Sequence, residues 1–158
     1  MDDFAILTRQ ITEQNLAGHV HRFSRLLAQL SEHRWAADGH PTVRTGHVQL
    51  LRNLDPAGTR ATVLAQRAQV TKQTMGRLVR ELAASGYVAL APDPADSRAQ
   101  LVRLTSRGAR FLAYLATTLQ DLTQAFERVL GASRLADFTA TLQDLTAFAE
   151  ARRQQTES

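Results

Sequence analysis

The chain is poor in several residue types. Its 158 residues include no cysteine, 8 glycines and 4 prolines, and only 6% are aromatic. Without cysteine there is no disulfide, thiolate nucleophile, thiol redox switch or sulfur-based zinc site. Few glycines, prolines and aromatics, beside many leucines and alanines, favour a mainly α-helical fold over a large sheet. At this length we expect one domain, either compact or elaborated by terminal helices.

Long apolar runs are also missing. No stretch approaches the ~18 apolar residues that a membrane-spanning helix needs, and the acidic start Met1-Asp2-Asp3 does not resemble a signal peptide. We therefore expect a cytoplasmic protein with no membrane partner. The motifs GxSxG and HExxH and a Gly-rich phosphate loop are absent, so we expect no enzyme and no cofactor. The histidines lack a neighbouring carboxylate cluster, so we expect no metal site.

Positive charge is concentrated in the middle third of the chain. The formal net charge is +4, but residues 60–110 alone hold nine Lys or Arg against three acids, which gives +6. A polyanion partner explains this concentration, because each phosphate neutralised by Lys or Arg releases counterions. A solvated basic face explains the charge equally well.

The spacing of apolar residues predicts helices before this basic segment. From Phe4 to Trp35 apolar residues mostly recur every three or four positions, which predicts one long amphipathic helix, loosened at Gly18. A second helix is predicted from Thr45 to Asn53 and is ended by the turn residues 55–58. The side chains predicted to face inward from the second helix are Val48, Leu51 and Leu54.

Two further helices are predicted in the last third of the chain, the first beginning near the end of the basic segment. Thr105 is expected to cap the first and Gly131 to end it, and Ser133 is expected to cap the last. Their apolar stripes, like that of the first helix, suit a partner helix, so we expect both ends of the chain to form a homodimer interface. The apolar residues of the last segment are Leu135, Phe138, Leu142, Leu145 and Phe148.

A helix-turn-helix is predicted inside the basic segment. A short helix from Thr62 to Ala68 is followed by a brief turn and by a helix over residues 71–85, with Thr71 as its N-cap and Gly86 just past its end. The apolar face of the second of these helices consists of Met75, Leu78, Val79 and Leu82.

A β-wing is predicted directly behind this helix pair. Residues 87–90 and 100–104 have the pattern of short strands, and residues 92–97 between them are predicted to form a turn region. The predicted fold class is therefore mainly α with a small two- or three-stranded antiparallel wing, a winged helix-turn-helix whose terminal helices form a dimerisation region.

The helix over residues 71–85 is the candidate for DNA recognition. A helix fits the major groove, where Gln binds adenine and Lys or Arg binds guanine or phosphate. Composition is not specific here, because any exposed helix carries such side chains. The residues of this helix predicted to contact DNA are Thr71, Lys72, Gln73, Thr74, Arg77 and Arg80.

Three charged residues of the wing complete the candidate DNA site. Arg98 is placed to enter a minor groove, where the negative potential favours arginine, and Arg103 adds a second cation. Asp96, two residues before Arg98, is expected to orient an arginine or to hold the turn. The alternative is a turn aspartate beside a solvated arginine.

The wing segment resembles that of the MarR family of winged helix-turn-helix transcription regulators. The family signature runs Asp-x-Arg-x-x-x-Val-x-Leu-Thr, and the resemblance covers about residues 45–110. The residues at its named positions are Asp96, Arg98, Val102, Leu104 and Thr105. Further matches are Leu64-Ala65, Val70-Thr71-Lys72-Gln73-Thr74, Leu78-Val79, Leu82, Gly86-Tyr87-Val88 and Gly108.

The resemblance implies a homodimer that binds double-stranded DNA at a palindromic operator and usually represses. It implies a DNA-binding lobe at residues 45–106 and a helical dimerisation region formed by residues 1–36 and 107–155. It also implies a small effector, often an aromatic anion. The candidate effector-binding residues are His19, Phe23, Trp35 and His47.

The sequence departs from the family pattern at two places. Gly76 replaces a residue whose side chain often touches DNA, so either a contact is missing or the backbone approaches the DNA closely. Leu90 and Ala91 replace a basic residue at the entry to the wing, which weakens the expected grip on phosphate. The alternative function is a winged-helix module that binds protein, without specific DNA binding.

Overall fold

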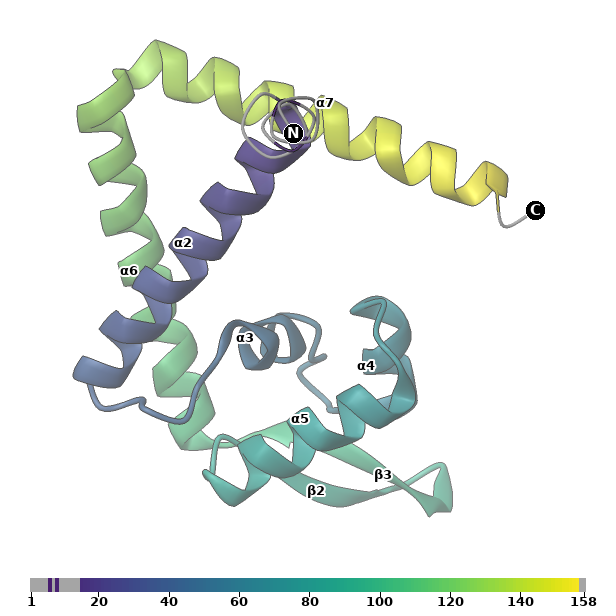
Figure 1. Cartoon of the computed structure of the whole chain (residues 1–158). Coiled ribbons are helices and arrows are strands. Elements are labelled where there is room, and N and C mark those ends of the chain that lie inside the picture. The colour runs from purple at the N-terminus through teal and green to yellow at the C-terminus, as the bar shows by residue number, and fades with distance from the viewer. Residues whose placement is uncertain (1–5, 7, 9–14, 157–158) are drawn as a thin grey trace. The chain divides into compact units, whose positions relative to one another are not determined.

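A computed structural model describes Ile6, Thr8 and residues 15–156 (Figure 1). The chain divides into two compact units, Met1–Ala109 and Arg110–Ser158. The first unit carries most of the α-helices and the whole three-stranded sheet, and the second is helical over its described residues except at Gly131. No helix among the described residues is long and apolar enough to cross a membrane.

The first long helix of the described chain, α2, spans Leu16–Ala37. Asn15 adopts an extended backbone, and its side chain accepts a hydrogen bond of 2.6 Å from the Gly18 N–H, so a new helix begins here. The prediction of one uninterrupted helix from Phe4, loosened at Gly18, is therefore wrong at Asn15. Apart from Ile6 and Thr8, its first eleven residues (4–14) lie outside the described part of the chain.

Three short helices follow: α3 (Thr45–Arg52), α4 (Ala61–Arg67) and α5 (Lys72–Ala84). The α5 helix packs against α3, α4 and the second strand of the sheet. The predicted apolar face of α5 is confirmed, because each of its members is at most 7% exposed: Met75, Leu78, Val79 and Leu82. In α3 the fully buried positions are His47, Leu50 and Leu51, whereas Val48 is only half-buried.

An antiparallel sheet of β1 (Thr59–Arg60), β2 (Val88–Asp93) and β3 (Asp96–Leu104) completes the unit in the order β1-β3-β2. The turn predicted over residues 92–97 is wrong, because only residues 94 and 95 form it and Asp93 pairs with Asp96. Pro92 lies in β2, which is an edge strand, the position in a sheet where proline is tolerated.

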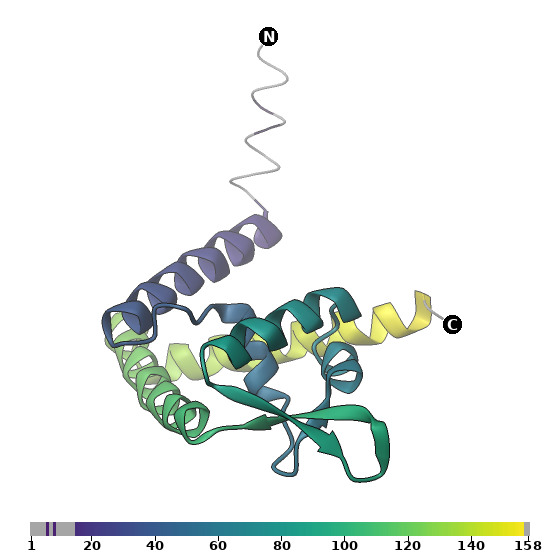
Figure 2. The ribbon, with the colours of Figure 1, turned by 90° about the horizontal axis from the view of Figure 1, so that it is seen from below.

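The hairpin and α5 are arranged so that the beginning of the helix and the tip of the hairpin lie together. The chain runs along α5, turns at Gly86, which has a φ of +75°, and returns along β2. Consequently the start of α5 and the tip of the hairpin lie at the same end of the unit (Figures 1 and 2).

Two helices of 25 residues each end the chain: α6 (Ser106–Leu130) and α7 (Ala132–Thr156). Thr105 caps α6 as predicted, since its Oγ1 accepts a hydrogen bond of 3.1 Å from the Gly108 N–H. Gly131, with a φ of +81°, separates the two helices. Ser133 does not cap α7, because the helix has already begun at Ala132.

Candidate nucleic-acid interface

The first turn of α5 presents polar side chains to solvent. Thr71 adopts an extended backbone, and its Oγ1 accepts a hydrogen bond of 3.1 Å from the Thr74 N–H, so the predicted N-cap is confirmed. The hydroxyls of these two threonines are 2.9 Å apart. Lys72 and Gln73 follow with exposed side chains. The start of α5 therefore offers hydroxyl, ammonium and amide groups on one short arc.

One turn further along, Arg77 is held by a carboxylate. Its Nη1 lies 2.7 Å from Oε1 of Glu81, and Oε2 of Glu81 lies 2.8 Å from Nε2 of His47. The hydrogen bond from His47, and secondarily that from Arg77, keeps the pKa of the Glu81 carboxyl below its ordinary value. Glu81 was missed from the sequence, although its position four residues after Arg77 on one helix face was a usable signal.

Arg80 lies over the glycine of the same helix. A Cβ added to Gly76 would lie 3.5 Å from Nη1 of Arg80, which is ordinary van der Waals contact. The space beside Gly76 is thus bordered by the end of a flexible side chain and not by backbone. Arg80 itself is exposed and extends the basic surface of α5 by one turn.

At the wing tip, Asp96 contacts Arg98 only through the backbone. Its Oδ1 accepts a hydrogen bond of 3.1 Å from the Arg98 N–H, and its Oδ2 lies 3.6 Å from Nη2 of Arg60. The arginine that Asp96 orients is therefore Arg60. The Arg98 side chain is exposed and forms no ion pair with any described residue.

Arg60 and Asp93 connect the helix-turn-helix to the wing. Arg60 is the last residue of β1 and the N-cap position of α4, and its guanidinium binds the buried carboxylate of Asp93 near the hairpin turn. Asp93 also accepts a hydrogen bond of 2.9 Å from the Ala95 N–H. That bond, followed by those from Arg60, lowers the pKa of Asp93. Sequence reasoning missed this pair because its members are 33 residues apart and no local pattern connects them.

Arg103 lies away from the wing tip. It follows Arg98 by five positions, which is ~17 Å along β3. A Cβ on Gly58 would lie 2.8 Å from Cγ of Arg103, so the stem of this arginine covers the turn before β1. Its exposed guanidinium is therefore at the base of the wing.

The structure does not bring the four candidate effector residues together. His19 and Phe23 are exposed on α2, whereas Trp35 is 4% exposed and lies ~24 Å from His19 along the helix axis. His47 is 3% exposed and is occupied by its bond to Glu81. The described residues contain no group of three or more His, Asp or Glu that could hold a metal ion.

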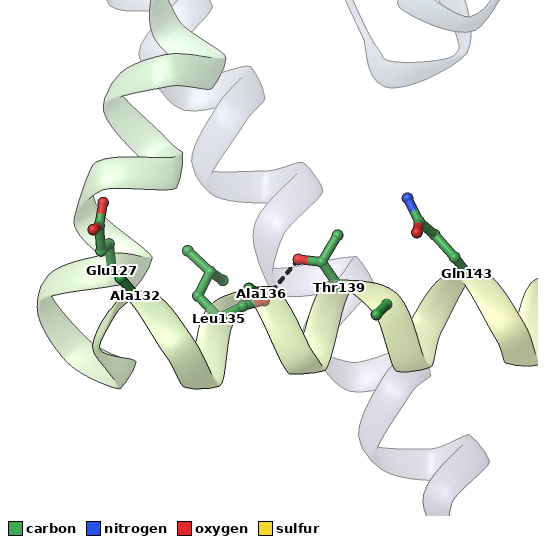
Figure 3. Close-up of a pocket in the computed structure, with 7 residues that line it drawn as sticks. Glu127, Ala132, Leu135, Ala136, Thr139 and Gln143 are labelled. Carbon is green, nitrogen blue, oxygen red and sulfur yellow. Dashed lines mark hydrogen bonds between the residues drawn. The ribbon is translucent and has the colours of Figure 1, made fainter.

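The second unit has a shallow hollow of its own where α6 meets α7. Figure 3 shows it along the first turns of α7, where Thr139 Oγ1 donates a hydrogen bond of 2.8 Å to the carbonyl of Leu135. Its walls are mostly small and apolar, with one carboxylate and one amide at the ends. The residues that line it are Glu127, Ala132, Leu135, Ala136, Thr139, Ala140 and Gln143.

The three helices, the hairpin behind them and the exposed basic side chains define a winged helix-turn-helix protein. Residues 41–99 match a sequence model described as the MarR family. Over this segment the resemblance to the MarR family that the sequence predicts is confirmed. None of the curated protein sequences compared with the chain matches it.

Solved structures of the family have the same fold. The chain is similar to the transcriptional regulator PcaV from Streptomyces coelicolor, solved with its natural ligand, at 25% identity and a TM-score of 0.63 over 85% of this chain and 96% of that one. The structure of FabT from Streptococcus pneumoniae in complex with DNA is 13% identical in sequence, with a TM-score of 0.74 over 87% of this chain and 97% of FabT. A mutant of MarR from E. coli is 22% identical, with a TM-score of 0.68 over 84% of this chain and 96% of that one. The chain has the fold of MarR family transcription regulators.

Proposed function

We propose that this protein is a cytoplasmic, sequence-specific DNA-binding regulator that represses transcription as a homodimer on a palindromic operator. One observation carries the proposal: the polar first turn of α5 lies at the same end of one unit as the tip of the hairpin (Figure 2), and the exposed Arg98 follows the turn of that hairpin by three residues. A helix start and a wing tip so placed suit adjacent major and minor grooves.

The charges of the unit support the same partner. Lys72, Arg80 and Arg98 are exposed and form no ion pair with any described residue, so their charges are available to phosphates. FabT, which shares the fold, was solved with DNA, and PcaV was solved with a ligand. We propose by analogy that this chain binds operator DNA and that a small aromatic or anionic ligand releases it.

A binding assay on DNA upstream of the protein's own gene tests the proposal. Retardation of one fragment at low salt, with affinity falling steeply as salt rises, is the expected result. The protected region should contain two half-sites about one helical turn apart. If no duplex is retarded at low salt, the proposal is wrong.

A double variant separates DNA binding from protein docking. Lys72→Ala combined with Arg98→Ala should abolish operator binding while the dimer, measured by sedimentation, persists. Arg52→Ala removes an exposed arginine from the last turn of α3 and serves as the control for charge. Unchanged operator affinity of the double variant would favour a protein-binding module.

A further inference from the structure

Arg77 is tied to the protein interior, unlike the other basic residues of the candidate interface. Its side chain is 59% exposed, but its Nη1 donates to Glu81, whose second oxygen accepts from His47, and the His47 side chain is only 4% exposed. The two bonds are 2.7 and 2.8 Å long. A short path of hydrogen bonds thus connects a buried imidazole on α3 with an exposed guanidinium on α5.

The imidazole end of this path is fixed on both sides. The backbone N–H of Arg44 donates a hydrogen bond of 3.0 Å to Nδ1 of His47. Since Nδ1 accepts this bond and a neutral imidazole has one donor and one acceptor, Nε2 carries the hydrogen and donates a hydrogen bond to Glu81. Because the ring is buried, it cannot turn over without leaving a buried polar atom unsatisfied. His47 therefore holds the Glu81 carboxylate in one place.

This anchoring distinguishes the Arg77–Glu81 pair from an ordinary surface ion pair. An exposed pair at positions i and i+4 contributes little, since two long side chains lose freedom when they meet in high dielectric. Here the carboxylate is already held by His47, so only the Arg77 side chain has to be ordered. Its remaining N–H groups stay exposed for a second partner.

The charge balance of the pair favours base contact over phosphate contact. Glu81 offsets the positive charge of Arg77, which reduces the sequence-independent attraction of this position for the DNA backbone. The fork of N–H donors is retained, and a fork of this kind matches O6 and N7 of guanine in the major groove. Arg77 is thus suited to discrimination between bases more than to overall affinity.

We propose that Glu81, anchored by His47, is a positioning residue that restricts Arg77 to one orientation and so determines part of the base specificity of this protein. The proposal rests on the proposed DNA-binding function. Glu81 acts through Arg77 and does not itself contact the operator.

Two substitutions at Glu81 test the positioning role separately from charge. Glu81→Gln keeps an oxygen for His47 but turns an amide NH2 toward Arg77, and Glu81→Asp keeps the charge but is too short to span both partners. For each variant the Kd is measured on a duplex selected by the wild-type protein and on a scrambled duplex of the same composition. Both variants should lower the ratio of specific to non-specific affinity about tenfold, the effect of one good base contact.

The scrambled duplex and a double variant provide the controls. Affinity of Glu81→Gln for the scrambled duplex should stay equal to wild type or rise, since a negative charge is lost. Glu150→Gln, which removes an exposed carboxylate from α7, should leave the ratio unchanged. In the Arg77→Ala background, Glu81→Gln should lower the ratio no further, because the residue through which it acts is gone.

The outcomes distinguish the two proposals. If the wild-type protein does not discriminate between selected and scrambled duplexes, the DNA-binding function fails. If the wild type discriminates and both Glu81 variants keep the full ratio, only the positioning role is wrong. The positioning role is also wrong if Glu81→Gln lowers the ratio of specific to non-specific affinity equally in the wild-type and in the Arg77→Ala background.

Discussion

The guanidinium of Arg60 binds the carboxylate of Asp93 through two nitrogens, Nε and Nη2, each 2.6 Å from Oδ2. Arg60 immediately precedes α4, and Asp93 ends the first strand of the hairpin, so this pair fixes the wing to the helix-turn-helix. The wing is consequently held at its outer part as well as through the β-ladder at its base.

Arg60→Ala should therefore destabilise the fold in a pH-dependent manner. The pKa of Asp93 is held below its ordinary value of 3.8, first by the Ala95 N–H and then by Arg60. A lowered carboxyl pKa stabilises the fold above the unfolded-state value, and this stabilisation is lost as the pH falls through the folded-state value. Urea denaturation should show the difference between wild type and variant shrinking as the pH falls from about 3.8 and vanishing only below the lowered folded-state pKa of Asp93; a difference that does not shrink over this range would contradict this origin.

Loss of the α5 cap should weaken the fold measurably. Thr71→Ala removes the acceptor for the Thr74 N–H and should lower the free energy of unfolding by about 1 kcal/mol. Thr71→Ser retains the hydroxyl and is the matched control. Equal urea midpoints for the Ala and Ser variants would show that the cap does not contribute.

Two glycine-to-alanine substitutions should have opposite effects. Gly76 lies inside α5 beside open space and the end of Arg80, so Gly76→Ala should raise the free energy of unfolding by about 1 kcal/mol. At Gly108 a Cβ would overlap the carbonyl oxygen of Tyr87 and the Leu104 side chain, so Gly108→Ala should lower it by about 1 to 3 kcal/mol. Thermal or urea unfolding compares the two directly.

The same Gly76 variant decides between the two interpretations of this glycine. If the backbone of α5 approaches DNA closely, Gly76→Ala should weaken operator binding although it stabilises the fold. If a side-chain contact is simply missing there, operator affinity should remain as in the wild type. A titration of the selected duplex at fixed salt distinguishes the two results.

Tyr87 connects the loop after α2 with the start of α6, and its hydroxyl should matter for stability. The Tyr87 hydroxyl lies 2.8 Å from Nδ1 of His40, and the Arg107 guanidinium lies 4.6 Å from the centre of its ring. Tyr87 is fully buried, so Tyr87→Phe should lower the free energy of unfolding by about 1 kcal/mol. Leu82→Val, a small truncation at another buried site, is a control for packing loss alone.

The histidine of this cluster should make stability depend on pH. Burial, and then the charge of Arg107, lowers the pKa of His40 below its ordinary 6.5, while Asp38 partly opposes the shift. The unfolded chain therefore binds the proton more readily, and stability should fall as the pH decreases from about 6.5 toward the lowered value. His40→Asn should reduce this dependence. If the free energy of unfolding, measured by urea denaturation, falls equally steeply between pH 7 and 5 for both proteins, His40 is not the source of the pH dependence.

The amphipathic pattern of α5, its Thr71 cap and the glycine behind it were all predictable from the sequence. Each depends on residues at most four positions apart, where helical periodicity and capping chemistry are decisive. The beginning of α2 shows how the same reasoning fails. Apolar spacing alone continues past Asn15, but the side chain of that residue competes for the backbone N–H groups and starts a new helix.

The sequence by itself determined the order of the helices, the buried face of α5 and the charge of the wing, since these follow from short-range patterns. Only the tertiary structure decided that Asp96 faces Arg60, that His47 is a buried anchor for Glu81 and that residues 92 and 93 extend a strand. The two side-chain contacts join residues more than 30 positions apart in the sequence, and the strand extension depends on pairing with β3. Their geometry is set by how helices and sheet pack around one core, and no local pattern encodes it.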